Sequence, residues 1–200
     1  MFFRSLLLLV MASTASAKDF VLVEFAESAT ESGWRIVNDT VMGGRSNSNY
    51  VVHDGALWFS GYLNTNGGGF ASVRGPRLAV PDDSFDRVRL RVRGDGRRYQ
   101  CRLEDRETGT TYRADFATRA NEWVTVELPL REFQATWRGR RLDRPPLSAD
   151  RIGSLGLLLA DGVDGAFKLA LARAVLSDGS KGDTGDVDRE PPVGQTIAQH

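Results

Sequence analysis

The segment from Phe85 to Asp105 reads FDRVRLRVRGDGRRYQCRLED. Apolar residues occupy every second position in both halves of it: Val88, Leu90, Val92, Tyr99, Cys101 and Leu103. This alternation is typical of β-strands with one buried and one exposed face. It predicts strands over 85–93 and 97–105, joined as a hairpin through Gly94-Asp95-Gly96.

The same alternation recurs along the chain, and no long stretch has the period of a helix. Further strands are predicted at 20–25, 34–37, 48–52, 56–63, 70–74, 110–116, 122–128, 152–160 and 166–176. Asp54-Gly55 predicts a second hairpin, and one helical turn is expected near Leu130 to Phe133. We therefore predict an all-β fold, a jelly-roll-like two-sheet β-sandwich. A closed barrel is the alternative, because strand number and alternation do not separate the two.

Composition favours one globular domain with flanking segments. The chain has 200 residues, of which 41% are apolar, and this is enough for a core. Its 26 basic and 26 acidic residues cancel, so bulk charge does not indicate nucleic-acid binding. We divide the chain into a signal peptide at 1–17, a β-sandwich domain at 18–176 and an acidic tail at 177–200. The tail is rich in Gly, contains Pro191-Pro192 and is predicted to be disordered, with docking on a partner as the alternative.

The first 17 residues have the features of an export signal. Arg4 precedes a short apolar run from Leu6 to Ala12, and Ala15-Ser16-Ala17 fits a cleavage site after Ala17. A periplasmic or secreted protein without a stable transmembrane segment after cleavage is expected, and retention as a membrane anchor is the alternative. Cys101 is the single cysteine, so no internal disulfide is expected, and its place in the alternation predicts burial.

Two glycine-rich loops contain the least common residue combinations. They run from Asn38 to Ser46, NDTVMGGRS, and from Asn64 to Arg74, NTNGGGFASVR. Asn and Asp fix loops by bonding nearby backbone amides, and Gly allows backbone to approach closely. We assign a structural role to Trp34, Gly43, Gly44, Gly68, Gly69 and Phe70, and candidate binding roles to Asn38, Asp39, Arg45, Ser46 and Arg74. Bracing of the fold is the interpretation that we favour for the glycines and Asp39.

These loops resemble the complex I intermediate-associated protein 30 family. The resemblance is carried by Trp34 with 38–46, by 55–63, by 66–74, by 123–129 with Phe133, by 138–140, by 152–157 and by 161–169. It covers nearly all of residues 20–176, and it implies a galactose-binding-like β-sandwich. Mitochondrial members assist assembly of respiratory complex I as chaperone-like assembly factors, and the export signal is a departure from that setting.

A row of arginines follows from the alternation alone. In 85–93 the apolar positions face one side, so Arg87, Arg89, Arg91 and Arg93 face the other. If the predicted hairpin forms, Arg102 joins the same face. Carboxylates on other strands neutralise the row in one interpretation, and in the other Arg89 and Arg91 bind an anionic partner. Trp137, beside Arg138, is the candidate for an exposed aromatic, while Trp34 and Trp58 are predicted to lie in the core.

No catalytic or cofactor signature is present. The sequence lacks zinc-ligand spacing, a Gly-x-Ser-x-Gly elbow and phosphate-binding fingerprints, so no cofactor and no metal are predicted. Asp161 and Asp164 are a candidate calcium site, for which a plain turn is the favoured alternative. An unrecognised hydrolase that uses Asp39 stays open, because paired carboxylates have no local signature.

Together these features predict a non-catalytic binding or assembly factor. Its partner is expected to be a protein, and nucleic acid is not expected. An exported carbohydrate-binding module that uses Trp137 and the arginine face is the alternative, with a hydrolase as the third hypothesis.

Overall fold

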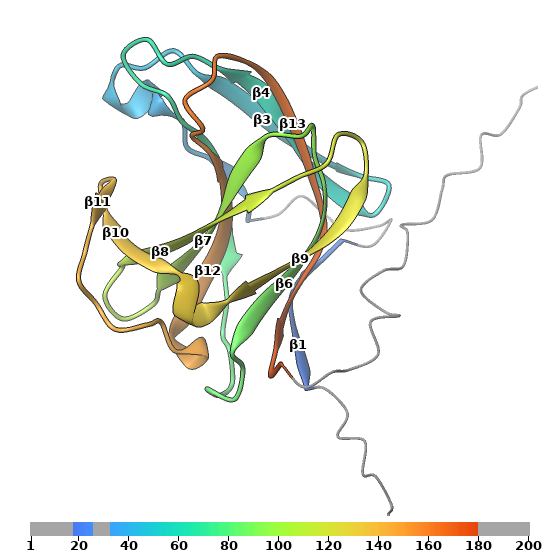
Figure 1. Cartoon of the computed structure of the whole chain (residues 1–200), viewed down its shortest axis with the longest axis vertical. Coiled ribbons are helices and arrows are strands. Elements are labelled where there is room, and N and C mark those ends of the chain that lie inside the picture. Colours follow the sequence, from blue (N-terminus) through green and yellow to red (C-terminus); the bar gives the residue numbers. More distant parts are fainter. Residues whose placement is uncertain (1–17, 26–32, 180–200) are drawn as a thin grey trace, which may run out of the picture.

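A computed structural model describes residues 18–25 and 33–179, and it shows an all-β chain with two antiparallel sheets (Figure 1). The predicted signal peptide and residues 180–200 of the predicted tail lie outside the described residues. Ser177, the first residue of that tail, is still in the last strand and is buried. Within the described part of the chain, no helix has the length and apolar character needed to cross a membrane.

The first sheet has the order β3-β4-β13-β6-β9, with β1 also paired to β13. Its strands are β1 (Asp19–Glu24), β3 (Asn47–His53), β4 (Ala56–Leu63), β6 (Arg87–Arg93), β9 (Trp123–Pro129) and β13 (Gly165–Ser177). β13 is long enough to pair with β4 along its first half and with β1 along its second half. The two ends of the described chain are therefore held together in one sheet.

The second sheet has the order β11-β10-β8-β7-β12-β5-β2. Its strands are β2 (Arg35–Ile36), β5 (Ala71–Arg77), β7 (Arg98–Asp105), β8 (Thr111–Ala117), β10 (Gln134–Trp137), β11 (Arg140–Arg141) and β12 (Ile152–Leu159). Three short 3₁₀ helices complete the described elements: η1 (Asp39–Met42), η2 (Leu130–Glu132) and η3 (Ala149–Arg151).

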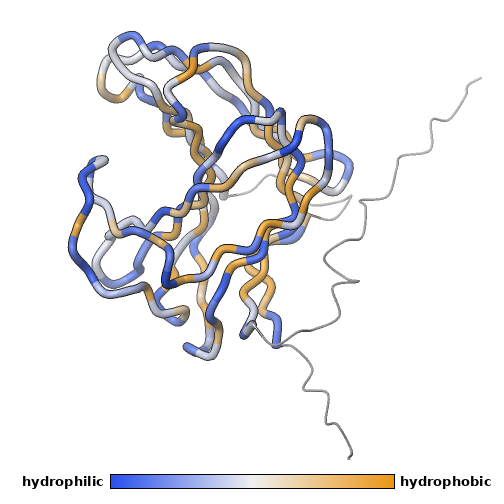
Figure 2. The backbone as a smooth tube through the Cα atoms, in the orientation of Figure 1, coloured by the Kyte–Doolittle hydropathy of each residue, from blue (hydrophilic) through white to orange (hydrophobic). Residues whose placement is uncertain are grey.

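The core lies between the sheets and is built from the alternating positions of their strands. Leu90 and Phe59 from the first sheet and Tyr99 and Leu103 from the second are fully buried. Cys101 is fully buried as predicted, and desolvation raises the pKa of its thiol far above the ordinary value. Hydrophobic and hydrophilic residues intermingle along the strands (Figure 2), as expected where alternate side chains point into the core.

The two-sheet sandwich, the hairpin at Asp54-Gly55 and the helical turn after Pro129 are confirmed. The hairpin through Gly94-Asp95-Gly96 is wrong, because β6 belongs to the first sheet and β7 to the second. Alternation identifies the buried face of each strand but not its neighbour. Two strands that bury their apolar faces in the same core from opposite sheets have the same pattern as a hairpin.

Candidate binding cleft

A cleft of about 690 Å³ opens on the outer face of the second sheet. Its floor is formed by side chains of β5, β7, β8 and β12 that point away from the core. The floor residues are Arg74, Gln100, Arg102, Glu104, Thr111, Arg113 and Leu158. In Figure 1 the β10–β11 hairpin and the loop that contains η1 lie on either side of this open face.

The strand register aligns arginines in one row across the floor. Arg102 on β7 lies opposite Arg113 on β8 and, on its other side, opposite Gly156 on β12. Gly156 in turn lies opposite Arg74 on β5, and Arg74 opposite Arg35 on β2. Four arginines therefore share a single row, which is interrupted only by Gly156. Like charges in directly opposite positions destabilise a sheet unless they are compensated.

Compensation inside the protein is weak. The guanidinium groups of Arg74, Arg102 and Arg113 make no hydrogen bond or ion pair with another described residue. Partial burial, followed by the nearby charges of Arg74 and Arg113, lowers the pKa of Arg102 to about 10. Burial and the charge of Arg35 also lower the pKa of Arg74, and Glu104 opposes this shift. The row is thus positively charged at neutral pH and partly removed from water.

The walls of the cleft stand at opposite corners of the floor. One wall consists of Met42, which is 70% exposed at the end of η1, and the partly buried Phe70. The other is the turn after β10, where Trp137 is 54% exposed. The guanidinium carbon of Arg138 lies 6.0 Å from the centroid of the Trp137 ring. The exposure predicted for Trp137 is confirmed, and the cleft combines a cationic floor with apolar rims.

Asp39 holds together the two loops that form the first wall. Its carboxylate is fully buried and accepts hydrogen bonds from the Ser46 hydroxyl at 2.6 Å and the Ser46 amide at 3.0 Å. The amides of Gly69 and Phe70 donate to it at 2.6 and 3.2 Å. Burial alone would raise the pKa of Asp39, but these donors outweigh it and hold the pKa below the ordinary value.

The glycines around Asp39 leave room for its carboxylate. A Cβ on Gly44 or on Gly68 would come within 2.3 Å of Asp39 side-chain atoms. Gly43 has a φ of 87° and ends η1 in the left-handed region, which side chains other than Gly rarely adopt. The hydrogen bonds to Asp39 come from within the two loops, and both of its carboxylate oxygens are engaged in them.

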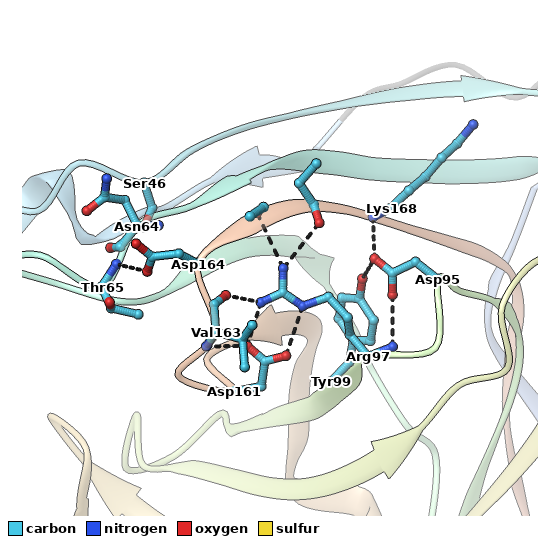
Figure 3. A network of polar contacts seen from close by, with 12 residues as sticks. Ser46, Asn64, Thr65, Asp95, Arg97, Tyr99, Asp161, Val163, Asp164 and Lys168 are labelled. Atoms are coloured by element: carbon cyan, nitrogen blue, oxygen red, sulfur yellow. Dashed lines mark hydrogen bonds and ion pairs between the residues drawn. The ribbon is translucent and has the colours of Figure 1, made fainter.

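A second polar network fixes the loop between β12 and β13 (Figure 3). Arg97 donates to both carboxylate oxygens of Asp161, at 2.9 and 2.6 Å, and also to the carbonyl oxygen of Val163. Asp164 accepts a hydrogen bond from the amide of Thr65 at 2.8 Å. Because Asp161 is neutralised by Arg97, the candidate calcium site is a braced turn. No cluster of three potential metal ligands occurs within residues 18–25 and 33–179.

The predicted arginine face does not exist as one surface. Arg89 and Arg91 lie on the outer face of the first sheet, are 6% and 9% exposed, and do not line the cleft. Arg89 forms an ion pair with Asp19 on β1, and Arg91 stacks over Trp123, 5.7 Å from its ring centroid. We therefore place neither residue in the binding site, which corrects our assignment.

Of the other predicted residues, Asn38 and Ser46 are buried in the loops that form the first wall. Asn38 is buried and accepts a hydrogen bond from Ser48 at 2.7 Å, Ser46 is buried against Asp39, and Arg45 is exposed.

Trp34 lies in the core, as predicted. Trp58 does not: it packs half-buried on the outer face of the first sheet, where the His53 ring stacks on it at 5.3 Å.

Arg102, Arg113, Glu104 and Thr111 are cleft residues that our site prediction omitted. Alternation gives their outward direction, since each lies between two buried positions in β7 or β8. The signal that was missing is the strand order. Only the pairing of β7 with β8 and β12 brings Arg113, Arg102 and Arg74 into one row.

Known proteins share the sequence pattern and the fold of this chain. The sequence matches the family described as complex I intermediate-associated protein 30 over residues 23–171. The chain belongs to this family. The mitochondrial complex I intermediate-associated protein 30 of Mus musculus is 28% identical in an alignment of 176 residues, and the match covers 76% of this chain and 54% of the mouse protein. A probable mitochondrial member from Caenorhabditis briggsae is 32% identical in an alignment of 95 residues, and this match covers 44% of this chain and 28% of that protein. The 200-residue chain thus spans about half the length of the mouse protein.

Solved structures support the galactose-binding-like sandwich. A family 11 carbohydrate-binding module from Clostridium thermocellum, in complex with a β-1,3-1,4-mixed-linked tetrasaccharide, superposes with a TM-score of 0.55 at 15% identity. The superposition covers 81% of this chain and 96% of the module. The corresponding module of a cellulosomal cellulase from the same organism gives a TM-score of 0.53 at 16% identity, over 81% and 95%. At such low identity the likeness is one of fold alone.

Proposed function

We propose that this chain is a non-catalytic binding protein that holds a partner protein during assembly, in a chaperone-like manner, through the cleft of the second sheet. The observation that carries this proposal is the arginine row, which has no counter-ion bonded to it within the described residues. Membership of a family named for association with a complex I intermediate supports a protein partner.

The cleft is better suited to binding than to catalysis. Glu104 is its one lining carboxylate in the described part of the chain, so a hydrolytic pair of carboxylates is not assembled there. Asp39, our hydrolase candidate, is engaged by four donors beneath the wall. The relatives are named as an intermediate-associated protein and as carbohydrate-binding modules, and neither name describes a catalyst.

Site-specific photocrosslinking tests the proposal. A benzoylphenylalanine introduced in place of Thr111 lies in the floor, and the same group in place of Val51 lies on the outer face of the first sheet, where Val51 is 43% exposed. We expect a discrete crosslinked protein from the Thr111 position and none from the Val51 position. Equal crosslinking at both positions, or none at either, contradicts the proposal.

A carbohydrate-binding module is the second candidate function, and Trp137 is the observation that favours it. An exposed indole at the rim of a polar cleft is a platform on which a sugar ring can stack. A glycan array with the wild type and the Trp137→Ala variant tests this candidate. Glycan binding by the wild type that is lost in the variant supports the carbohydrate-binding function. Absence of binding to any glycan on the array contradicts it.

The place of action that we propose is the periplasm or the exterior, on the basis of residues 1–17 alone. N-terminal sequencing of the protein from its native envelope fraction tests this proposal. A mature chain that begins at Lys18 supports export with cleavage after Ala17. An intact Met1 in the soluble cell interior contradicts it.

A further inference from the structure

The positions of the arginines within the row indicate which kind of ligand the cleft binds. Arg113 and Arg102 lie directly opposite each other on neighbouring strands, with no ion pair to either within the described residues. Such an arrangement costs folding free energy. A carboxylate bound between the guanidinium groups removes this repulsion, and Arg recognises carboxylates through paired, charge-assisted hydrogen bonds.

The floor also contains a small hollow that can take one oxygen atom of a carboxylate. A space of about 20 Å³ lies between Arg74 and Arg102, over Gly156 and beside Ser154, and Glu104 also lines it as the single carboxylate against two guanidinium groups. This volume accommodates roughly one water-sized group. The space exists because Gly156 has no side chain: a Cβ there would lie 2.9 Å from the Val73 carbonyl oxygen and 3.6 Å from Cγ of Arg74. The row thus has a recess at its centre with a cation on each side.

The rims indicate a peptide ligand. Met42, Phe70 and Trp137 line the cleft together with arginines, and no lysine of residues 18–25 or 33–179 is part of its lining. Arg, Met and aromatic residues are the types enriched at protein interfaces, whereas Lys is depleted there. Met42 and Trp137 are 70% and 54% exposed, so apolar side chains of a partner can pack on them.

From these features we infer that the cleft binds a short, extended, acidic peptide segment of a partner protein, with its carboxylates on Arg74, Arg102 and Arg113. This inference rests on the proposed function and adds the ligand chemistry. The row from Arg113 to Arg35 crosses five strands, which corresponds to roughly 19 Å. About six extended residues cover that length, and their alternate side chains are roughly 6.8 Å apart on one face. Acidic residues at alternate positions therefore point to the row, and the residues between them are free to contact the rims.

Fluorescence anisotropy with purified protein tests the inference. The probe is a fluorescein-labelled hexapeptide of sequence Glu-Ala-Glu-Phe-Glu-Ala, and its control carries Gln in place of each Glu. The protein variants are the double variant Arg74→Gln/Arg102→Gln and, as a control for loss of an arginine outside the cleft, Arg119→Gln, since Arg119 is 75% exposed and does not line the cleft. Urea unfolding of each variant confirms that it is folded.

We expect the acidic peptide to bind at least tenfold more tightly than the Gln peptide, and more weakly as salt is raised. The double variant is expected to lose at least tenfold in affinity, and Arg119→Gln less than twofold. Equal binding of both peptides, or equal binding by the double variant, overturns the inference.

A hexagalacturonate probe separates the peptide from an acidic glycan. Binding of this glycan in place of the peptide, with the same loss in the double variant, overturns the peptide assignment. Crosslinking at Thr111 distinguishes failure of the acidic-peptide inference from failure of the proposed protein-binding function. A protein crosslinked at Thr111 without affinity for the acidic peptide removes this inference and leaves the proposed function standing. Absence of the crosslink removes the proposed function itself.

Discussion

Two groups of arginines on this molecule have the same sequence pattern and opposite surroundings. On the first sheet, Arg87 and Arg89 pair with carboxylates of Glu127 and Asp19. On the second sheet, Arg102 and Arg113 face each other across neighbouring strands with no bonded carboxylate in the described residues. The first group is part of the stabilising structure of the fold. The guanidinium groups of the second group have no bonded partner in the described residues, and the proposed ligand site rests on this difference.

The difference shows that a count of arginines does not identify a site. Arg87 and Arg89 follow from alternation in 85–93, Arg102 from alternation in 97–105 and Arg113 from alternation in 110–116. Compensation depends on segments far away in sequence, since Asp19 lies 70 positions before Arg89. The experiments below perturb each side of this comparison.

The largest effect is expected from Asp39→Asn, which removes the support of one cleft wall. The amide cannot accept all four hydrogen bonds that the carboxylate accepts, so buried donors of Ser46 and Gly69 lose a partner. We expect a loss of about 3 kcal/mol in the free energy of unfolding, measured by urea titration. Asp54→Asn, at an exposed turn, is the control, and an equal loss in the two variants would contradict this role of Asp39.

Low pH should reduce the contribution of Asp39 to the free energy of unfolding of the wild type. Its pKa in the folded protein lies below the ordinary value of 3.8, so the folded state binds this proton less readily than the unfolded state. The stabilisation is therefore complete above the unfolded pKa and is lost as the pH falls through the folded pKa. The difference in unfolding free energy between wild type and Asp39→Asn should shrink below about pH 4. A difference that is constant from pH 7 to pH 2 would refute this linkage.

Substitution of one carboxylate near each group of arginines tests the comparison directly. Asp19→Ala leaves Arg89, only 6% exposed, without its ion-pair partner. We expect a cost of about 2 kcal/mol, because an uncompensated buried charge is unfavourable. Glu104→Ala is expected to cost less than about 0.5 kcal/mol, since Glu104 makes no ion pair within the described residues. Equal costs in thermal or urea unfolding would show that the two groups are not different.

Gly156→Ala is expected to fill the recess between Arg74 and Arg102. The new Cβ comes within 2.9 Å of a backbone oxygen of the neighbouring strand, so β5 and β12 must separate slightly. We expect a destabilisation of about 1 kcal/mol together with weaker binding of the acidic hexapeptide. Gly162→Ala is the control for destabilisation without filling of the recess: its φ of 78° strains any side chain, but the position does not line the cleft, so peptide affinity should not change. Unchanged peptide affinity in Gly156→Ala would show that the recess is not used.

The smallest expected change in the free energy of unfolding is a gain, whereas the substitutions above are all expected to cause a loss. Arg102→Gln removes one of two facing charges, so we expect the folded protein to gain about 0.5 kcal/mol while it loses ligand affinity. Arg89→Gln on the first sheet should instead lower stability, because it leaves Asp19 without its partner. Urea titrations of both variants at low salt measure the two signs. A loss of stability in Arg102→Gln would mean that its neighbours already compensate its charge.

Prediction from sequence succeeded where the evidence was local. The strands 56–63 and 98–105, the hairpin at Asp54-Gly55 and the burial of Cys101 all follow from period-two alternation and turn chemistry. The short strand Gln134–Trp137 was missed, because four residues give too little alternation to distinguish a strand from a loop.

The candidate site was predicted only in part. Arg74 and Trp137 were selected for their loop position and expected exposure, and both line the cleft. Arg89 and Arg91 were selected because the two halves of 85–105 read as a hairpin, and the structure separates those halves into different sheets. Arg113 was overlooked, since its significance depends on Arg102 lying opposite it.

The sequence by itself determined which face of each strand is buried and the family, because both depend on residues that are close together in the chain. Tertiary structure alone decided which arginines are neutralised and which are not. The reason is physical: charge compensation acts over a few ångströms in space, and the carboxylate within reach of a given arginine depends on strand order and register. Neither of these is encoded in local alternation, so the cleft becomes visible only when β7, β8, β12 and β5 lie side by side.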